Sequence, residues 1–233
     1  MPRVELPPGQ GDAPRRRPAA HPQHTEPASA SPSHATAAPP AGRTLTFVTG
    51  NAGKVAELSA LLAPLGIQVA ADGRGYPEVQ AATLREVTEA GAKHLLDSGL
   101  RPPFILEDSG LFVAALKGFP GVYSRYALDT LGIAGLLQLL RGVELETRTA
   151  AFQADLAYVD PTGAVHHFAG ACRGRIAERP SGSNGFGFDP VFVPEGHPLT
   201  FADMDPAEKS RLSHRGQAVM LLARHLASRA ASP

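Results

Sequence analysis

The chain has 233 residues, 43% of them hydrophobic, and its 22 basic residues are balanced by 22 acidic ones. This length predicts one domain of about 190 residues plus a tail, and the lack of a basic excess argues against a surface for long nucleic acid. The single cysteine, Cys172, excludes an intramolecular disulfide and suits a reducing cytoplasm. No apolar run approaches the roughly 18 residues of a membrane span, so we expect a cytoplasmic protein without a membrane partner.

Residues 1–42 differ in composition from the rest of the chain. They are rich in Pro, Ala, Ser and His and nearly lack large aliphatic residues. Such a segment cannot bury enough apolar surface to offset its ordering entropy, so it is predicted to be a disordered tail. It has no apolar region typical of a secretory signal. The predicted folded domain therefore covers residues 43–233.

Strand and helix patterns alternate from residue 43 onward. Runs of β-forming residues predict strands at 44–48, 67–70 and 104–107, and the last of these precedes a predicted DSG turn and another apolar run at 111–116. Alternation at 149–159 and 165–171 across a PTG turn predicts an antiparallel hairpin. Helical spacing of apolar residues predicts helices at 54–65, 84–100, 131–140 and 213–231. These patterns together predict an α/β domain with a mixed sheet.

The segment TGNAGK follows the first predicted strand and opens the first predicted helix. A strand, a tight turn and a helix start present backbone N–H groups to an anion. Gly50 and Gly53 let the backbone approach a ligand closely, and Lys54 adds a compact positive charge. We interpret this loop as a triphosphate cradle, although an ordinary βα turn would explain the segment if it stood alone.

Two adjacent carboxylates, Glu107 and Asp108, are predicted to lie at the end of a buried strand in LEDSG. The carboxyl ends of strands in an α/β sheet are where ligand crevices open. Carboxylates beside a triphosphate require a divalent cation between them, and Mg²⁺ prefers such ligands. Glu78 in YPEVQ is a further candidate ligand, and Glu86 or Glu89 would serve equally well on local sequence alone.

A glycine-rich segment, SGSNGFGFDPVF, carries two aromatic residues and one acid, Phe186, Phe188 and Asp189. An aromatic side chain offers a purine a stacking surface, while a carboxylate or a backbone amide can bind the edge of the base. For Phe188 we favour a place in the hydrophobic core.

Basic residues gather in AEKSRLSHRGQA, where Lys209, His214 and Arg215 surround the start of the last predicted helix. Ser213 is its predicted N-cap. Basic groups beside a helix N-terminus reinforce an anion site, so this cluster is predicted to bind the ligand.

The motifs TGNAGK, LEDSGLFVAALKGFPGVYS, GFGFDPVF and AEKSRLSHRGQA, in this order, resemble the inosine triphosphate pyrophosphatase family. The likeness covers residues 44–226, and the combination of PEVQ with LEDSG looks more like the archaeal and eukaryotic branch. It implies an elongated mixed sheet flanked by helices. It also implies a Mg²⁺-dependent homodimer that hydrolyses ITP, dITP and XTP to the monophosphate and pyrophosphate.

The resemblance also implies roles for individual residues. Asp108 matches the proposed general base, and Glu78, Glu107 and Asp108 match metal-associated acids. Nucleotide contacts are implied for Thr49, Gly50, Asn51, Ala52, Gly53, Lys54, Ser109, Phe186, Gly187, Phe188, Asp189, Lys209, His214 and Arg215. The helix at TLREVTEAGAK lacks the asparagine of the usual bacterial members, so Glu78 is preferred to Glu86 as the metal ligand.

Two other functions are compatible with some of these features. A P-loop kinase or ATPase is disfavoured because GNAGK is too short for the Walker pattern and Val55 stands where Ser or Thr would bind Mg²⁺. A non-catalytic purine nucleotide-binding module on the same fold stays open, because a fold does not fix a function. The adjacent acids Glu107 and Asp108 favour an enzyme.

Overall fold

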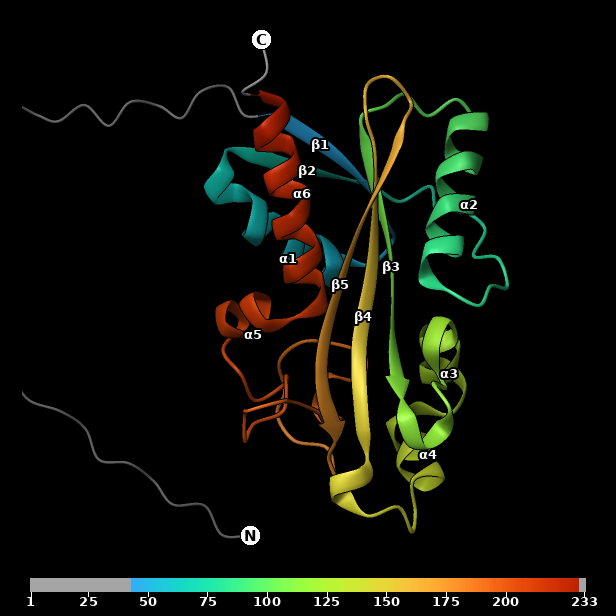
Figure 1. Ribbon diagram of the computed structural model, residues 1–233, viewed down its shortest axis with the longest axis vertical. Helices are drawn as coiled ribbons and strands as arrows, with labels where there is room; N and C mark the ends of the chain where they lie inside the picture. Colours follow the sequence, from blue (N-terminus) through green and yellow to red (C-terminus); the bar gives the residue numbers. More distant parts are fainter. Residues whose placement is uncertain (1–42, 231–233) are drawn as a thin grey trace, which may run out of the picture. The chain divides into compact units, whose positions relative to one another are not determined.

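Six strands form one mixed sheet in the computed structural model, which describes residues 43–230 (Figure 1). The strand order is β2–β1–β3–β4–β5–β6. The strands are β1 (Arg43–Val48), β2 (Ile67–Asp72), β3 (Phe104–Val113), β4 (Thr149–Val159), β5 (Val165–Ile176) and β6 (Phe192–Pro194). β1 pairs in parallel with β2 and β3, whereas the pairs from β3 to β6 are antiparallel. The predicted α/β class and mixed sheet are confirmed.

Helices lie on both sides of this sheet, with α1 and α6 on one side and α2 on the other (Figure 1). The α-helices are α1 (Ala52–Leu62), α2 (Leu84–Asp97), α3 (Ser124–Thr130), α4 (Gly132–Leu139), α5 (Pro206–Leu212) and α6 (His214–Ala230). Short 3₁₀ helices are η1 (Ala63–Leu65), η2 (Ala114–Leu116), η3 (Gly121–Tyr123), η4 (Leu145–Thr147) and η5 (Asp189–Val191). No helix within residues 43–230 is long and apolar enough to cross a membrane. The predicted tail, residues 1–42, lies outside the described residues.

Local sequence explains several boundaries. Gly66, with φ 70°, ends the η1 turn after α1, as the predicted stop at this residue requires. Ser213 Oγ accepts a hydrogen bond of 3.0 Å from the amide of Gly216, which confirms it as the cap of α6. The apolar side of α6, with Val219, Leu222 and Leu226, packs in the cluster that also contains α1 and the sheet. The hairpin of β4 and β5 is also confirmed.

The predicted DSG turn is wrong, because β3 runs without a break from Phe104 to Val113. Its polar residues suggested a turn, but all ten residues of β3 pair with β4. Pairing with a neighbouring strand outweighs the weak β preference of Asp, Ser and Gly. Helices α3 and α5 were not predicted, because the glycine- and proline-rich sequence before α3 and the short length of α5 gave no clear periodicity.

The site is positioned by the different lengths of two parallel strands. β1 ends at Val48, which pairs with Leu106, while β3 continues for seven more residues. The space beyond the end of β1 is therefore bordered by the middle of β3. Side chains alternate along a strand, and Ile105 packs with the α1 and α6 cluster while Leu106 packs with α2. Glu107 consequently faces α6, and Asp108 faces the opposite side.

Candidate active site

A cavity of about 600 Å³ lies at the carboxyl end of β1. All the residues predicted for the site line it, although they come from five separate stretches of the chain. They are Thr49, Gly50, Asn51, Ala52, Gly53, Lys54, Glu78, Glu107, Asp108, Ser109, Phe186, Gly187, Phe188, Asp189, Lys209, His214 and Arg215. The fold thus brings the four motifs and Glu78 into one place.

The TGNAGK loop starts α1 at the cavity, but several of its amides are already bonded. Asn51 Oδ1 accepts from the amides of Gly53 at 2.9 Å and Lys54 at 3.2 Å, and so caps the helix. The amide of Asn51 itself donates to Thr49 Oγ1. The predicted cradle therefore offers a ligand fewer backbone donors than the sequence suggested, with Lys54 as its charge.

Glu107 is buried on the α6 side and holds two cations. Its carboxylate lies 3.1 Å from Lys54 Nζ and 3.1 Å from Arg215 Nη2. Burial raises the pKa of Glu107, but the charges of Arg215 and Lys54 outweigh this effect and lower it to about 2. Arg215 Nη2 also donates to Ser109 Oγ at 3.2 Å. Glu107 is thus ionised and fixes both cations at the cavity.

The ion-pair network continues to a residue that the sequence analysis missed. Glu57 of α1 accepts from Lys209 Nζ at 2.7 Å and from Arg215 Nη1. Lys209 Nζ also lies 2.6 Å from Asp189 Oδ2. Glu57 follows Lys54 by three residues, which places both on one side of a helix, and this spacing was the available signal. Three cations, Lys54, Lys209 and Arg215, are therefore held by three acids on this side of the sheet.

The other side of β3 carries an acid without a cationic partner. Within residues 43–230, Asp108 forms no ion pair, and burial together with the charges of Glu107 and Glu78 raises its pKa to about 7, against the lowering effect of Lys54. Such a carboxyl group changes its protonation near neutral pH, which suits a general base. Asp108 is the predicted catalytic residue, and its environment matches that role.

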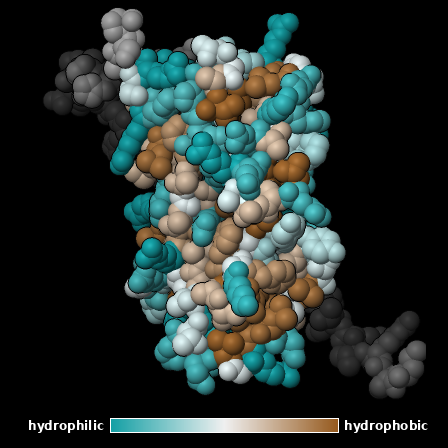
Figure 2. Space-filling model, turned by 45° about the vertical axis from the view of Figure 1, so that its right-hand side comes forward, coloured by the Kyte–Doolittle hydropathy of each residue, from teal (hydrophilic) through white to brown (hydrophobic). Residues whose placement is uncertain are grey.

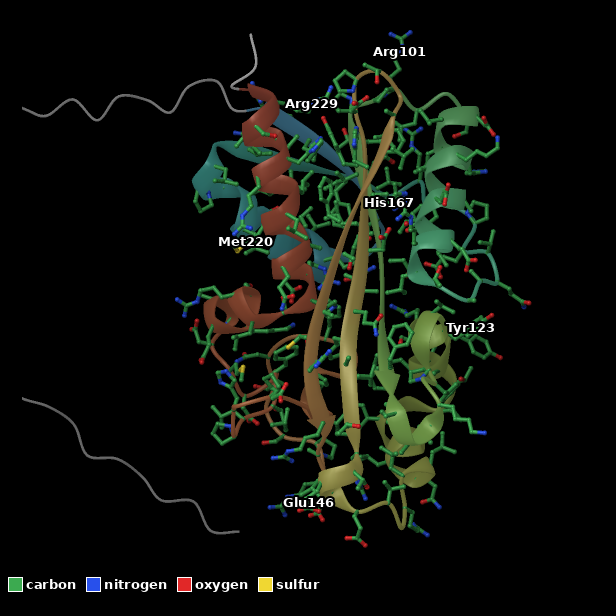
Figure 3. All side chains as sticks on the ribbon, viewed as in Figure 1. Arg101, Tyr123, Glu146, His167, Met220 and Arg229 are labelled. Carbon is green, nitrogen blue, oxygen red and sulfur yellow. The ribbon has the colours of Figure 1, made fainter. Side chains whose placement is uncertain are left out.

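Asp155 lies directly opposite Asp108 in the β3–β4 ladder. Its carboxylate accepts from Thr88 Oγ1 of α2 and lies 2.8 Å from His167 Nδ1 of β5. Figure 3 labels His167 beside the sheet, toward α2. These partners hold the side chain of Asp155 behind the cavity, which Asp155 does not line.

The choice between Glu78 and Glu86 is decided by position. Glu86 Oε2 accepts from the amides of Ala82 and Thr83 and forms a capping box at the start of α2. It does not line the cavity, whereas Glu78 does. The role of Glu86 is therefore to begin a helix, and Glu78 is the acid beside Asp108.

Phe186 and Phe188 have different environments. Phe188 is 3% exposed and packs in a hydrophobic cluster, as predicted. Phe186 is half-buried beside Gly53, where a Cβ atom would lie 2.6 Å from its ring. Lys209 Nζ lies 5.0 Å from the centre of the Phe186 ring. Gly53 thus makes room for an aromatic ring at the helix start.

His214 is buried and uncharged at neutral pH. Its ring stacks on Phe152 with 4.9 Å between ring centres. Burial, together with the charge of Arg215, lowers its pKa well below the usual value. Nδ1 has no hydrogen-bond partner in the described part of the chain. The positive charge expected from the basic cluster of AEKSRLSHRGQA is therefore supplied by Lys209 and Arg215 and not by His214.

Nine further lining residues were not among the predicted site residues. They are Val48, Gly75, Tyr76, Gly110, Val122, Ser124, Arg125, Leu128 and Phe152. Arg125 adds a positive charge from α3, where it pairs with Asp129 at 2.7 Å. Since α3 was not predicted, the sequence gave no reason to place Arg125 at the site.

The acids of the cavity fit a hydrated divalent cation better than a fully protein-bound one. Between residues 43 and 230 there is no group of three or more His, Cys, Asp or Glu side chains arranged to hold a metal. Asp108 and Glu78 are two carboxylates of one cavity that form no ion pair with the described residues. Mg²⁺ commonly binds one or two carboxylates together with waters and phosphate oxygens. The residues present therefore fit Mg²⁺.

Comparison with known proteins identifies the family of this chain. The model of the Ham1 family matches residues 45–225. The chain belongs to the Ham1 family. The match includes every predicted site residue, and the resemblance drawn from the motifs is confirmed.

Curated relatives and solved Ham1 structures each cover about three quarters or more of the chain. A dITP/XTP pyrophosphatase of Thermococcus kodakarensis is 53% identical over 75% of this chain and 92% of its own length. A dITP/XTP pyrophosphatase of Methanopyrus kandleri is 47% identical over 74% of this chain and 90% of its own length. A HAM1 protein structure from Coxiella burnetii superposes with a TM-score of 0.69 at 32% identity, covering 80% of this chain and 99% of that one.

Proposed function

We propose that this chain hydrolyses the non-canonical purine nucleoside triphosphates ITP, dITP and XTP to the monophosphate and pyrophosphate. One observation carries this proposal. A single cavity contains the cations Lys54, Lys209 and Arg215 and also a carboxyl group, that of Asp108, whose pKa is raised. Ham1 relatives named dITP/XTP pyrophosphatase support the substrate class. Removing such nucleotides would cleanse the nucleotide pool.

Recognition of the base is proposed to use backbone donors of the segment 186–189. Asp189 Oδ2 already accepts from Lys209 Nζ and from the amide of Phe186 at 2.7 Å. The amides of Gly187 and Phe188 have no hydrogen-bond partner in the described residues. A 6-oxo purine can accept from such donors, whereas the 6-amino group of adenine would leave a donor unpaired, at a cost of about 1–3 kcal/mol. Phe186 would stack on the base.

The phosphate chain is proposed to bind between Lys54 and the carboxyl groups of Asp108 and Glu78. Lys54 is anchored by Glu107 and is 15% exposed at its side chain, so it keeps a surface for a phosphate oxygen. Asp108 accepts a proton from, or orients, the water that attacks the α-phosphorus. Among the described residues that line the cavity, no nucleophile and base are paired as a covalent mechanism requires, so direct attack by water is the simplest reaction.

Magnesium is proposed to be held by Asp108 and Glu78. When bound, it offsets the negative charge that develops on the leaving pyrophosphate. The family resemblance also implies Glu107 as a metal-associated acid. We propose instead that Glu107 acts through Lys54 and Arg215, because its carboxylate is bonded to both.

A homodimer is proposed on a strand surface that no helix covers. On β5, Ala169 and Ala171 are exposed, while the alternate residues Gly170 and Cys172 are buried. Exposed apolar residues near α3 and α4, including Tyr126 and Leu139, extend this surface. Figure 2 shows apolar surface along the middle and lower end of this face, and Figure 3 shows Tyr123 on the outer side of α3. Large exposed apolar surfaces commonly mark interfaces.

Light scattering tests the proposed homodimer. It should give the mass of two chains for the wild-type protein and the mass of one chain for Ala171→Lys.

The deciding experiment is a product analysis with Mg²⁺ and a panel of dITP, XTP, dATP, dGTP and dTTP. Pyrophosphate and monophosphate should form in equal amounts from dITP and XTP, and much more slowly from dATP. Orthophosphate and dIDP as first products would contradict attack at the α-phosphorus. Binding of dITP without turnover would favour the alternative, a non-catalytic nucleotide-binding module.

A further inference from the structure

Tyr76 is a cavity residue to which the proposed reaction gives no role. It stands in the loop between β2 and α2 and lines the cavity together with Glu78 and Asp108. Its ring packs against the α2 cluster, where a Cβ atom on Gly91 would lie 2.6 Å from the ring. The absence of a side chain at Gly91 therefore lets the ring lie against α2 and fixes its direction.

The hydroxyl group of Tyr76 has a poor protein partner. It lies 3.5 Å from the carbonyl oxygen of Glu107, at the outer limit of a hydrogen bond. The same carbonyl oxygen already accepts from Lys54 Nζ at 3.0 Å. A phenylalanine would fill the space against Gly91 equally well, so packing does not explain the hydroxyl group. A half-buried donor with so weak a bond is available to a ligand.

The surroundings of this hydroxyl group define the ligand chemistry. Glu78 and Asp108, which form no ion pair with the described residues, make this part of the cavity acidic, whereas Glu107 is neutralised by Lys54 and Arg215. A neutral phenol is a donor that adds no charge and can turn its proton toward a new acceptor. Phosphate oxygens brought in with Mg²⁺ would be such acceptors.

We propose that the Tyr76 hydroxyl group donates a hydrogen bond to the phosphate chain and, with Lys54, positions it beside Asp108. This inference rests on the proposed function and adds a phosphate contact to it. Hydrogen bonds to charged groups contribute about 1.5–3 kcal/mol, which corresponds to roughly 10- to 100-fold in kcat/KM.

The test compares Tyr76→Phe with Tyr158→Phe as a matched control. Tyr158 is also buried, at 5% exposed, but belongs to the cluster on the other side of the sheet and does not line the cavity. Tyr76→Phe should lower kcat/KM for dITP roughly 10- to 100-fold and weaken inhibition by inorganic pyrophosphate. Inhibition by deoxyinosine, which has no phosphate, and the melting temperature should stay unchanged. Tyr158→Phe should leave all four measurements at wild-type values.

A second variant moves the ring and keeps the hydroxyl group. Gly91→Ala should displace Tyr76 and weaken pyrophosphate inhibition in the same way. Wild-type kcat/KM and pyrophosphate inhibition in Tyr76→Phe would overturn the proposal. So would equal losses with deoxyinosine, or an unfolded Tyr76→Phe protein, since the hydroxyl group would then serve the fold. If the wild-type chain releases no pyrophosphate from dITP, the proposed function fails. Calorimetry of pyrophosphate and Mg²⁺ binding to the same variants still tests Tyr76.

Discussion

The two sides of β3 at the cavity differ in how their acids are neutralised. On the α6 side, Glu107 is bonded to Lys54 and Arg215, and its pKa is lowered to about 2 despite its burial. On the other side, Asp108 has no ion pair with the described residues, and its pKa is raised to about 7, first of all by burial. These are consecutive residues of one strand. The alternation of a β-strand thus gives neighbouring carboxylates opposite properties.

This difference suggests that the two sides of β3 have different roles. The α6 side is a fixed frame in which Lys209 and Arg215 are each held by two acids and Lys54 by Glu107, so little should change when a ligand binds. The Asp108 side contains acids whose charges are not neutralised by the described residues, and it gains most from a metal ion. Groups whose environments separate their pKa values typically have different roles in a reaction.

The largest effect is expected from removing the carboxylate with the raised pKa. Asp108→Asn should lower turnover of dITP roughly 10²- to 10⁴-fold. Calorimetry should still detect dITP binding, because the ion pairs of Lys54, Lys209 and Arg215 are unchanged. EDTA should abolish wild-type activity, and Mg²⁺ should restore it. Full activity of Asp108→Asn, or activity in EDTA, would show that the different environments of Glu107 and Asp108 do not contribute to catalysis.

Removing an ion-pair partner from the α6 side of the cavity should mainly reduce the stability of the protein. Arg215→Ala leaves Glu107 buried without its bidentate partner, and the free energy of unfolding should fall by about 3–5 kcal/mol. Chemical denaturation measures this change. Lys93→Ala is the control, because the Lys93–Asp97 pair is exposed and contributes less than about 1 kcal/mol. Equal losses in the two variants would mean that the α6-side network is no more important than a surface pair.

The raised pKa of Asp108 should make the wild-type protein less stable at alkaline pH. A carboxyl group whose folded pKa is above its unfolded value of 3.8 stabilises the fold fully below that value, and loses this contribution as pH rises through about 7. In chelator at pH 8, Asp108→Asn should therefore raise the free energy of unfolding by roughly 2–4 kcal/mol. The gain should disappear near pH 3. A pH-independent difference would contradict the environment described for Asp108.

The smallest effect should separate the two candidate acids near α2. Glu86→Ala removes the capping box and should lower the melting temperature slightly, with turnover unchanged. Glu78→Gln should lower turnover and raise the Mg²⁺ concentration needed for half-maximal activity, with stability unchanged. Initial-rate measurements over a range of Mg²⁺ concentrations test both. If Glu86→Ala changed the Mg²⁺ concentration needed for half-maximal activity, Glu86 at the start of α2 would also contribute to the metal site.

Much of the fold and site could be predicted because the signals were local. The PTG turn between two alternating segments gave the β4–β5 hairpin, and Gly66 gave the end of the first helical segment. Glu57 and Tyr76 were missed because their roles depend on partners far along the chain, such as Lys209 at a separation of 152 residues. The DSG segment was misread because its neighbour in the sheet, β4, starts at Thr149, 39 residues after Gly110.

The sequence by itself determined which chemical groups the site contains and which local structures carry them. A glycine-containing loop at a helix start, two adjacent acids and a basic cluster are visible without coordinates, since each depends on residues close together in the chain. Only the tertiary structure decided which groups neutralise each other. Burial and the choice of ion-pair partner depend on distances between distant segments, and these set the pKa of Glu107 low and that of Asp108 high.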